Sequence, residues 1–568
     1  MQSYRGSFTG GTVQGASERR AGPPVRRPGR RVITRWLAAA AVLAMAPDAA
    51  AQAAPRPRPR LVVAIAVDQL RADYMERFRP YFGAGGFNLF FQRGASFAQA
   101  RYAHATTSTC PGHAVILTGS YGEVNGIIAN EWYDIQTGRP TYCAEDPAVT
   151  LAGSAGPGRS PRKLFGATVG DVLKTATAGR SRVVTVSAKD RSAIMLGGQL
   201  ADAAYWIVDT LFVTSTYYRS DLPAWVREFN ASRAISQYFG RSWERLLPVA
   251  AYQMMGPDDG PGERDVAGMG RTFPHRIAGI DALHSAPFLN DVVADFAMRA
   301  IDAEGLGRDT VPDLLGISFS ANDGVGHAYG PDSHEVMDVT VRLDRTLQRL
   351  FGFLDRTLGL ANVVVVLTAD HGVAPLPEVL TGIRPGSTAR RLDPAIIENA
   401  VRKALSARYG QVDAPGWVVY HEPPMMYLNR RALAALNVPL EDAERVAQAA
   451  VRSVPGVHEV LTGSELTRLR AAGTESGPVR SFHPSRSGNL YYMLEPYWLP
   501  DATGSGAEHG SGWRYDQDVP LLWFGRGILP GAHQGPADVA DIAPTLSTLL
   551  GLLSPGGSQG RVLSEILR

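Results

Sequence analysis

The chain lacks an excess of charge of either sign over most of its length. The 568 residues include 57 basic and 54 acidic side chains. Residues 1–51 hold eight arginines and two acids, so the remainder has 49 basic and 52 acidic residues. A nearly neutral, slightly acidic protein gives no indication that it binds nucleic acid or anionic membranes.

Long apolar runs are also missing. The run "WLAAAAVLAMA" (36–46) is too short to span a bilayer, so we expect no stable membrane anchor. Five arginines between residues 26 and 35 precede it and an Ala-x-Ala cleavage site ends at Ala51, which is the pattern of an export signal. We therefore expect a signal peptide at 1–51, by the general or the twin-arginine route, a linker at 52–60, and a periplasmic or secreted protein.

Cysteine is scarce, with only Cys110 and Cys143 in the chain. In an oxidising compartment these two thiols could form a disulfide. The sequence does not give the Cα separation that a disulfide requires, so two buried free thiols are an equal alternative. Internal repeats, coiled-coil patterns and low-complexity tracts are not seen beyond the N-terminus.

What the sequence does contain is a set of short apolar, β-branched runs that end in ionisable residues. Such runs are typical of strands buried on both faces of a parallel sheet. Helical patterns lie between them, and ligands of open α/β sheets bind outside the carboxyl ends of the strands. We predict an α/β fold with a mostly parallel central sheet, helices on both faces and one site. The runs are "LVVAIAVD" to Asp68, "SRVVTVSAKDR" to Lys189 and Arg191, "DLLGISFSAND" to Asp323, and "NVVVVLTADH" to Asp370 and His371.

Two segments interrupt the α/β alternation. Residues 201–310 are rich in Trp, Tyr, Met and loop signals, and residues 376–500 contain an αβ-like piece of their own. We predict a cap at 201–310 and a second insertion at 376–500. The catalytic core then consists of residues 61–200, 311–375 and 501–568.

Three aspartates and three histidines at loop positions could bind metal. Carboxylate and imidazole ligands suit two zinc-like ions, each with a position left for substrate. Two such ions form a clamp for phosphoryl or sulfuryl transfer. One position could accept another divalent ion, and the acidic loops could hold an added Ca²⁺. A non-catalytic metal-binding protein is the alternative from a different class. The predicted ligands are Asp68, Asp323, His327, Asp370, His371 and His509.

The stretch "TSTCPGH" is a candidate nucleophile segment. Pro111 suits the first position of a helix, which puts Thr109 at the N-cap, where a helix favours an alkoxide and a bound phosphate. Taken alone, the segment equally fits a threonine that only caps a helix. A cysteine hydrolase is disfavoured, because a catalytic Cys110 usually finds its histidine far away in sequence, whereas His113 is close enough to pack locally.

Taken together, the motifs resemble the alkaline phosphatase superfamily. Asp68, "TSTCPGH", "GIIANEW", "SAKDR", "DGVGH", "ADHG" and "EHGSG" follow the family's order from residue 61 to about 550. The chain is similar to the bacterial threonine-nucleophile alkaline phosphatases, relatives of the nucleotide pyrophosphatase/phosphodiesterase branch. The resemblance implies a covalent phosphothreonine on Thr109, which also contacts the metal of Asp68, Asp370 and His371. It assigns Asp323, His327 and His509 to a second metal, and Asn130, Lys189 and Arg191 to the phosphoryl oxygens.

Two basic side chains distinguish a phosphate monoesterase from a diesterase. A phosphate monoester is a dianion that Lys189 and Arg191 can neutralise, whereas a diester needs apolar room there. The sulfatase pattern of this superfamily requires a cysteine where Thr109 stands and an arginine where His113 stands. We expect an exported two-zinc alkaline phosphatase that acts on small phosphate monoesters and releases inorganic phosphate. A phosphodiesterase or nucleotide pyrophosphatase is the alternative, and the oligomeric state stays open.

Overall fold

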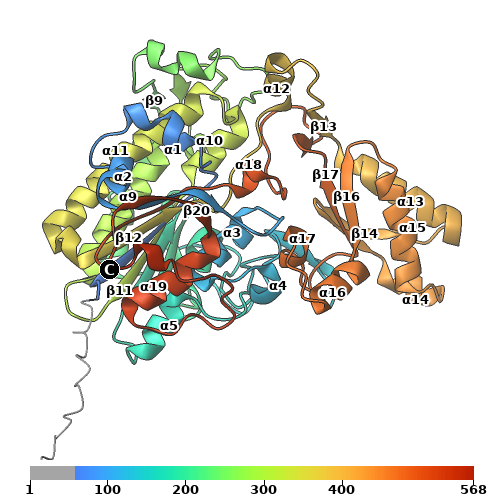
Figure 1. The fold of residues 1–568 in the computed structure, drawn as a ribbon, viewed down its shortest axis with the longest axis horizontal. Helices are drawn as coiled ribbons and strands as arrows, with labels where there is room; N and C mark the ends of the chain where they lie inside the picture. Colours follow the sequence, from blue (N-terminus) through green and yellow to red (C-terminus); the bar gives the residue numbers. More distant parts are fainter. Residues whose placement is uncertain (1–57) are drawn as a thin grey trace, which may run out of the picture. The chain divides into compact units, whose positions relative to one another are not determined.

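The structure is a computed structural model that describes residues 58–568. The predicted signal peptide (1–51) and most of the predicted linker (52–60) lie outside the described residues. The largest feature is a ten-stranded sheet of order β20-β2-β19-β12-β1-β11-β6-β7-β8-β5 (Figure 1). Its strands are β1 (Leu61–Val67), β2 (Ala95–Arg101), β5 (Leu151–Ala152), β6 (Val183–Ser187), β7 (Ala203–Val208), β8 (Leu211–Ser215), β11 (Asp313–Phe319), β12 (Val363–Thr368), β19 (Leu521–Gly525) and β20 (Gly531–Asp538).

The centre of this sheet is parallel. Strands β12, β1, β11, β6 and β7 are neighbours that run in one direction. Every residue of β1, β6, β11 and β12 is buried, which explains why these segments are continuously apolar. Antiparallel pairs occur only towards the edges, where β19 joins β12 to β2 and β8 joins β7 to β5. The predicted fold class is confirmed.

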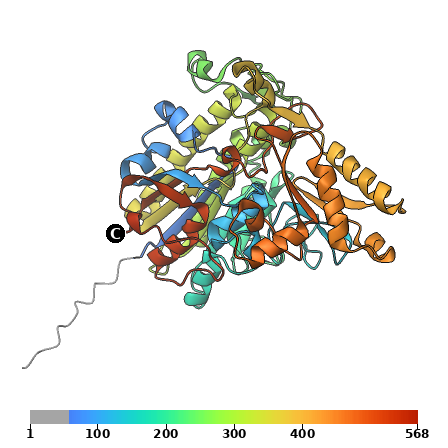
Figure 2. The same cartoon turned by 45° about the vertical axis from the view of Figure 1, so that its right-hand side comes forward.

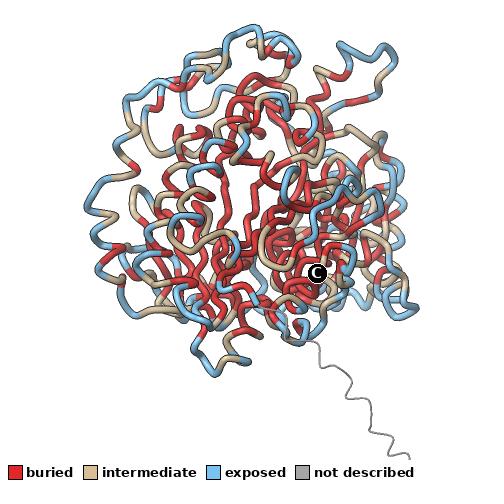
Figure 3. Tube along the Cα trace, turned by 60° about the vertical axis from the view of Figure 1, so that its left-hand side comes forward, coloured by how far each residue is buried: buried red, intermediate tan, exposed pale blue. Residues whose placement is uncertain are grey.

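Helices cover both faces of the sheet and leave its strands in the buried interior (Figures 1 and 3). On one face, α9 packs on β6 and β11 and also against α11, and α2 packs on β19. On the other face, α6 packs on β6 and β7, and α3 packs against α5, α6 and α19. The helices are α2 (Phe87–Arg93), α3 (Thr109–Thr118), α5 (Val169–Ala176), α6 (Asp190–Gly197), α9 (Phe288–Glu304), α11 (His334–Leu358) and α19 (Ile542–Leu550).

A second, smaller sheet lies within the segment 376–500. Its order is β14-β15-β17-β16, and all of its pairs are antiparallel. Helices α13 and α15 pack on it with a hydrophobic core of their own (Figure 2). We call this part the small sheet unit. It comprises α13 (Pro394–Tyr409), β14 (Val418–Glu422), β15 (Met425–Leu428), α15 (Leu440–Arg452), β16 (Val457–Thr462) and β17 (Leu490–Leu494).

The segment 201–310 differs from the cap that we predicted. Its first part forms β7 and β8 of the ten-stranded sheet, and its last part forms α9, which packs on that sheet. Tyr205 and Trp206 are buried there, so these aromatic side chains fill the core instead of a cap. The residues between 216 and 287 form short helices, loops and the two-stranded pair of β9 (Ser242–Trp243) and β10 (His275–Arg276).

No helix within residues 58–568 combines the length and the apolar character that a bilayer crossing requires.

Candidate active site

The ionisable residues of the predicted site meet at one edge of the central sheet. Strands β12, β1, β11 and β6 are consecutive neighbours, and each is followed by residues of the predicted set. Because the strands are parallel, their carboxyl ends lie at the same edge. They present Asp370 and His371 after β12, Asp68 after β1, Asp323 and His327 in α10 (Ala321–Tyr329) after β11, and Lys189 and Arg191 after β6.

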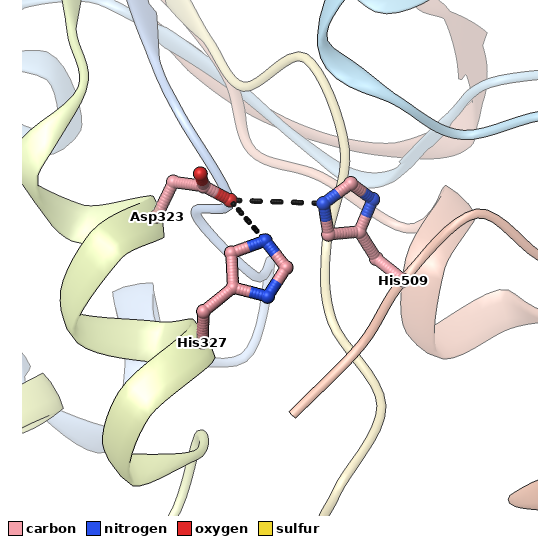
Figure 4. Close-up of side chains that lie close together, drawn as sticks. All are labelled: Asp323, His327 and His509. Carbon is pink, nitrogen blue, oxygen red and sulfur yellow. Dashed lines mark ion pairs between the residues drawn. The ribbon is translucent and has the colours of Figure 1, made fainter. Parts of the chain in front are cut away.

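One cluster consists of Asp323, His327 and His509 (Figure 4). The Asp323 Oδ1 atom lies 3.3 Å from His327 Nε2 and 3.7 Å from His509 Nε2. Asp323 and His327 are one helical turn apart in α10, so both side chains leave the same face of the helix. His509 comes from a glycine-rich loop about 180 residues further along the chain. Three such donors around one point could hold a divalent metal ion.

A second cluster consists of Asp68, Asp370 and His371, all of them fully buried. His371 Nε2 lies 3.5 Å from Asp68 Oδ1 and 3.4 Å from Asp370 Oδ2. These three atoms have no hydrogen-bond partner among the described residues. Buried polar atoms normally find partners, so three unpaired atoms that converge fit a bound cation.

The three histidines share an arrangement that prepares them as metal ligands. The Nδ1 atoms of His327, His371 and His509 lie 2.7, 2.9 and 2.8 Å from the backbone carbonyls of residues 507, 372 and 107. A carbonyl only accepts, so each Nδ1 carries a proton and each Nε2 is left facing the carboxylates. Metal-binding histidines characteristically donate their other N–H in this way.

The buried carboxylates of the site also favour a bound cation. Burial, together with Asp323 and Asp370, raises the pKa of Asp68 to about 8. Burial lowers the pKa of His327, but the Asp323 carboxylate outweighs it and raises that pKa to about 9. The Lys189 ammonium lies 2.6 Å from both Asp68 Oδ2 and Asp323 Oδ2 and so links the two clusters.

Thr109 is the first residue of α3, and Ser108 is the N-cap. The helix therefore begins one residue earlier than Pro111 indicated, because proline is tolerated throughout a first turn whose N–H groups have no helical partners. Thr109 is 1% exposed. Helix α3 approaches the second cluster closely, since a Cβ on Gly112 would lie 2.1 Å from the Asp370 carbonyl oxygen.

Asn130 and Arg191 lie on either side of the α3 N-terminus. The Cys110 N–H donates to Asn130 Oδ1 at 2.8 Å, which leaves the Asn130 amide N–H groups for another acceptor. Arg191 Nη2 lies 3.4 Å from Thr109 Oγ1, and its buried Nε has no partner within residues 58–568. A Cys110–Cys143 disulfide ties the Asn130 loop to α3, which resolves the alternative that the sequence left open.

Two further residues contact the site and were missed from the sequence. The Gln69 side chain donates to Asp323 Oδ1 at 2.7 Å, and its backbone N–H donates to Asp370 Oδ1 at 3.1 Å. His113 is fully buried, with Nδ1 2.9 Å from the Thr109 carbonyl oxygen and 3.1 Å from Asp370 Oδ2, and with Nε2 2.9 Å from the Ser318 hydroxyl. Helical spacing placed His113 one turn after Thr109, but nothing in the sequence showed that β11 and β12 pack against that turn.

The α/β fold and this cluster of aspartates and histidines define a class of metal-dependent phosphoester hydrolases. The model of the type I phosphodiesterase/nucleotide pyrophosphatase family matches residues 62–514. The chain belongs to this family, and the resemblance to the alkaline phosphatase superfamily is confirmed.

Particular relatives are named alkaline phosphatases. Alkaline phosphatase PhoV of Synechococcus elongatus is 34% identical over 89% of this chain and 93% of that protein. Alkaline phosphatase PafA of Elizabethkingia meningoseptica is 32% identical over 89% of this chain and 94% of that protein. The crystal structure of wild-type PafA superposes with a TM-score of 0.85, covering 90% of this chain and 99% of that chain. A further PafA structure carries substitutions of a threonine, an asparagine, a lysine and an arginine, the last two separated by one residue.

Proposed function

We propose that this protein is an alkaline phosphatase that hydrolyses phosphate monoesters through a covalent phosphothreonine on Thr109. The observation that carries the proposal is the meeting of two metal-ligand clusters, a helix N-terminal threonine and a Lys-x-Arg pair at one sheet edge. The named relatives support it, and so does the PafA variant, whose substituted residue types match Thr109, Asn130, Lys189 and Arg191 in order.

In the proposed reaction the Thr109 hydroxyl oxygen gives up its proton and attacks phosphorus, the bond from phosphorus to the alcohol oxygen breaks, and the alcohol leaves with a proton. Arg191 and Lys189 neutralise the phosphoryl oxygens, and the free Asn130 N–H groups orient them. Water then attacks the phosphothreonine, which regenerates Thr109 and releases inorganic phosphate. The 3.4 Å contact between Arg191 Nη2 and Thr109 Oγ1 supports a phosphoryl group bound next to this hydroxyl.

For the metals, we propose two Zn²⁺ ions. Asp68, Asp370 and His371 would hold one, with Thr109 as a further ligand, and Asp323, His327 and His509 would hold the other. Bound zinc would supply electrostatic stabilisation of the oxygens that gain charge. Mixed carboxylate and imidazole donors support zinc at both positions, although another divalent ion could occupy one of them. The signal-like pattern at residues 1–51 supports export to the periplasm or medium.

The first prediction tests monoesterase against diesterase chemistry. With p-nitrophenyl phosphate and methyl p-nitrophenyl phosphate, which share a leaving group, we expect kcat/KM for the monoester to be at least about 100-fold higher. Lys189 and Arg191 favour the dianion, which explains why the monoester should be the better substrate.

Treatment with a chelator should abolish activity, and Zn²⁺ should restore it, with metal content measured on the same sample. A dominant diesterase rate would favour the phosphodiesterase alternative, and full activity of metal-free protein would refute the metal assignment.

The second prediction concerns His113 as a positioning residue for Asp370. His113→Leu removes the imidazole whose Nδ1 lies 3.1 Å from Asp370 Oδ2, so the affinity for Zn²⁺ in a chelator competition assay should fall about 10- to 100-fold. His113→Asn places an amide nitrogen near the position of Nδ1 and should retain most of that affinity. Equal zinc affinity in all three proteins would show that the His113 contact does not orient the ligand.

A further inference from the structure

A pocket beside the site is lined mainly by aromatic and aliphatic side chains. One wall belongs to the small sheet unit and to β18 (Trp498–Pro500), and it includes Met493 and Trp498. The other wall is the loop that carries His509 and continues to Asp516. We call this cavity the aromatic pocket. It shares His509 with the Asp323 cluster, so it borders the place where chemistry is proposed.

The side on which the alcohol is expected to depart also favours this pocket. The nucleophile and the phosphoryl-binding residues come from α3, α6 and the Asn130 loop. In an in-line displacement the alcohol departs on the side opposite to the nucleophile. The loops that carry His371 and His509 both line the pocket, the first through Ala374 and the second through His509 itself.

Two polar atoms of the lining residues lack partners within the described chain. Trp498 Nε1 is a buried donor without an acceptor, and Asp516 Oδ1 is a buried acceptor without a donor. The benzo edge of Trp498 packs on Gly456, which turns the Nε1 edge elsewhere. Asp516 Oδ2 is already held by the Ser511 N–H and hydroxyl at 2.9 and 2.6 Å. Since buried polar atoms are normally paired, two unpaired atoms on residues that line one pocket are consistent with a ligand bound there.

The charge of the lining restricts that ligand. The pocket residues include the acids Glu508 and Asp516, and none of those described is lysine or arginine. A second phosphate or a carboxylate on the alcohol portion would therefore be repelled. Flat aromatic walls favour a neutral planar ring, because ring pairs gain energy beyond that of burying area.

We infer that the aromatic pocket binds the alcohol portion of the substrate and selects neutral, aromatic alcohols over aliphatic ones. The inference rests on the proposed phosphomonoesterase function, for which it names the substrate class.

Binding can be separated from turnover in the zinc-loaded Thr109→Ala protein. Calorimetry would compare benzyl phosphate, cyclohexylmethyl phosphate and ethyl phosphate, which carry the same phosphoryl group on alcohols of similar acidity. We expect benzyl phosphate to bind about 10-fold more tightly than either aliphatic ester. Adding Trp498→Ala should reduce this preference to about twofold or less, as should Met493→Ala if the tryptophan variant does not fold.

The matched control is Phe165→Ala, which removes an aromatic side chain that is 41% exposed and lies outside the pocket. The preference for benzyl phosphate should survive it. Equal affinity for the three esters would overturn the inference, and so would a preference that Trp498→Ala and Met493→Ala leave intact. Equal affinity for the benzyl and cyclohexylmethyl esters would overturn the aromatic selectivity. If unmodified protein hydrolyses none of the esters, the proposed function fails instead, whatever the binding preference.

Discussion

Thr109→Ala should lower kcat/KM for a phosphate monoester by about 10,000-fold or more, while zinc content stays unchanged. The loss follows because the covalent route has no other nucleophile at this point, and removal of a nucleophile typically costs this much or more. The metal should stay bound because the six carboxylate and imidazole ligands are untouched. Steady-state kinetics and metal analysis of the same preparation would measure both effects.

Ser108 provides the matched control for Thr109. It lies next to Thr109 as the N-cap of α3, and its buried hydroxyl has no hydrogen-bond partner among the described residues. Ser108→Ala should keep kcat/KM within about tenfold of the unmodified protein, because the Ser108 hydroxyl makes no capping hydrogen bond and its loss removes no contact of the site. Thr109→Ser should retain activity. Acid quenching followed by mass spectrometry should place phosphate on Thr109, and phosphate on Ser108 would contradict the assignment.

The convergence of the site was predictable because it follows from the geometry of parallel strands. Asp68, Asp323 and Asp370 each come soon after a continuously apolar run, and such runs are strands whose carboxyl ends share one edge. The order β12-β1-β11-β6 was not predictable. It depends on which helices cross which face, and that is decided by side-chain packing between segments hundreds of residues apart.

Other features could not be predicted because they depend on contacts across the fold. The sequence of β7, "AAYWIV", indicated a cap through its aromatics, but Tyr205 and Trp206 pack in the sheet core. Gln69 links the two clusters only because Gly326 has no side chain, since a Cβ there would lie 1.7 Å from Gln69 Oε1. The Cys110–Cys143 pairing required the distance between α3 and the Asn130 loop.

Replacement of Lys189 and Arg191 should distinguish monoesterase from diesterase chemistry more clearly than any other substitution. With both replaced by alanine, kcat/KM for p-nitrophenyl phosphate should fall about 1,000-fold or more, because two charge-assisted interactions with the dianion are lost. The same change should reduce kcat/KM for methyl p-nitrophenyl phosphate less than about tenfold, since a diester carries one negative charge fewer. The monoester-to-diester ratio therefore measures the effect without depending on the amount of active protein.

The contacts of Lys189 require a control, because its ammonium also lies between Asp68 and Asp323. Removing it leaves two buried carboxylates uncompensated, which would change zinc affinity as well as substrate affinity. Kinetics at saturating Zn²⁺, with bound metal measured, keep the two effects apart. The Arg191 side chain contacts neither Asp68 nor Asp323, so Arg191→Ala should by itself lower the monoester-to-diester ratio. Arg191→Lys should recover part of that ratio, because the charge returns without the planar donor geometry. Equal losses for both esters in every variant would mean that these cations organise the site without recognising the second charge of the phosphoryl group.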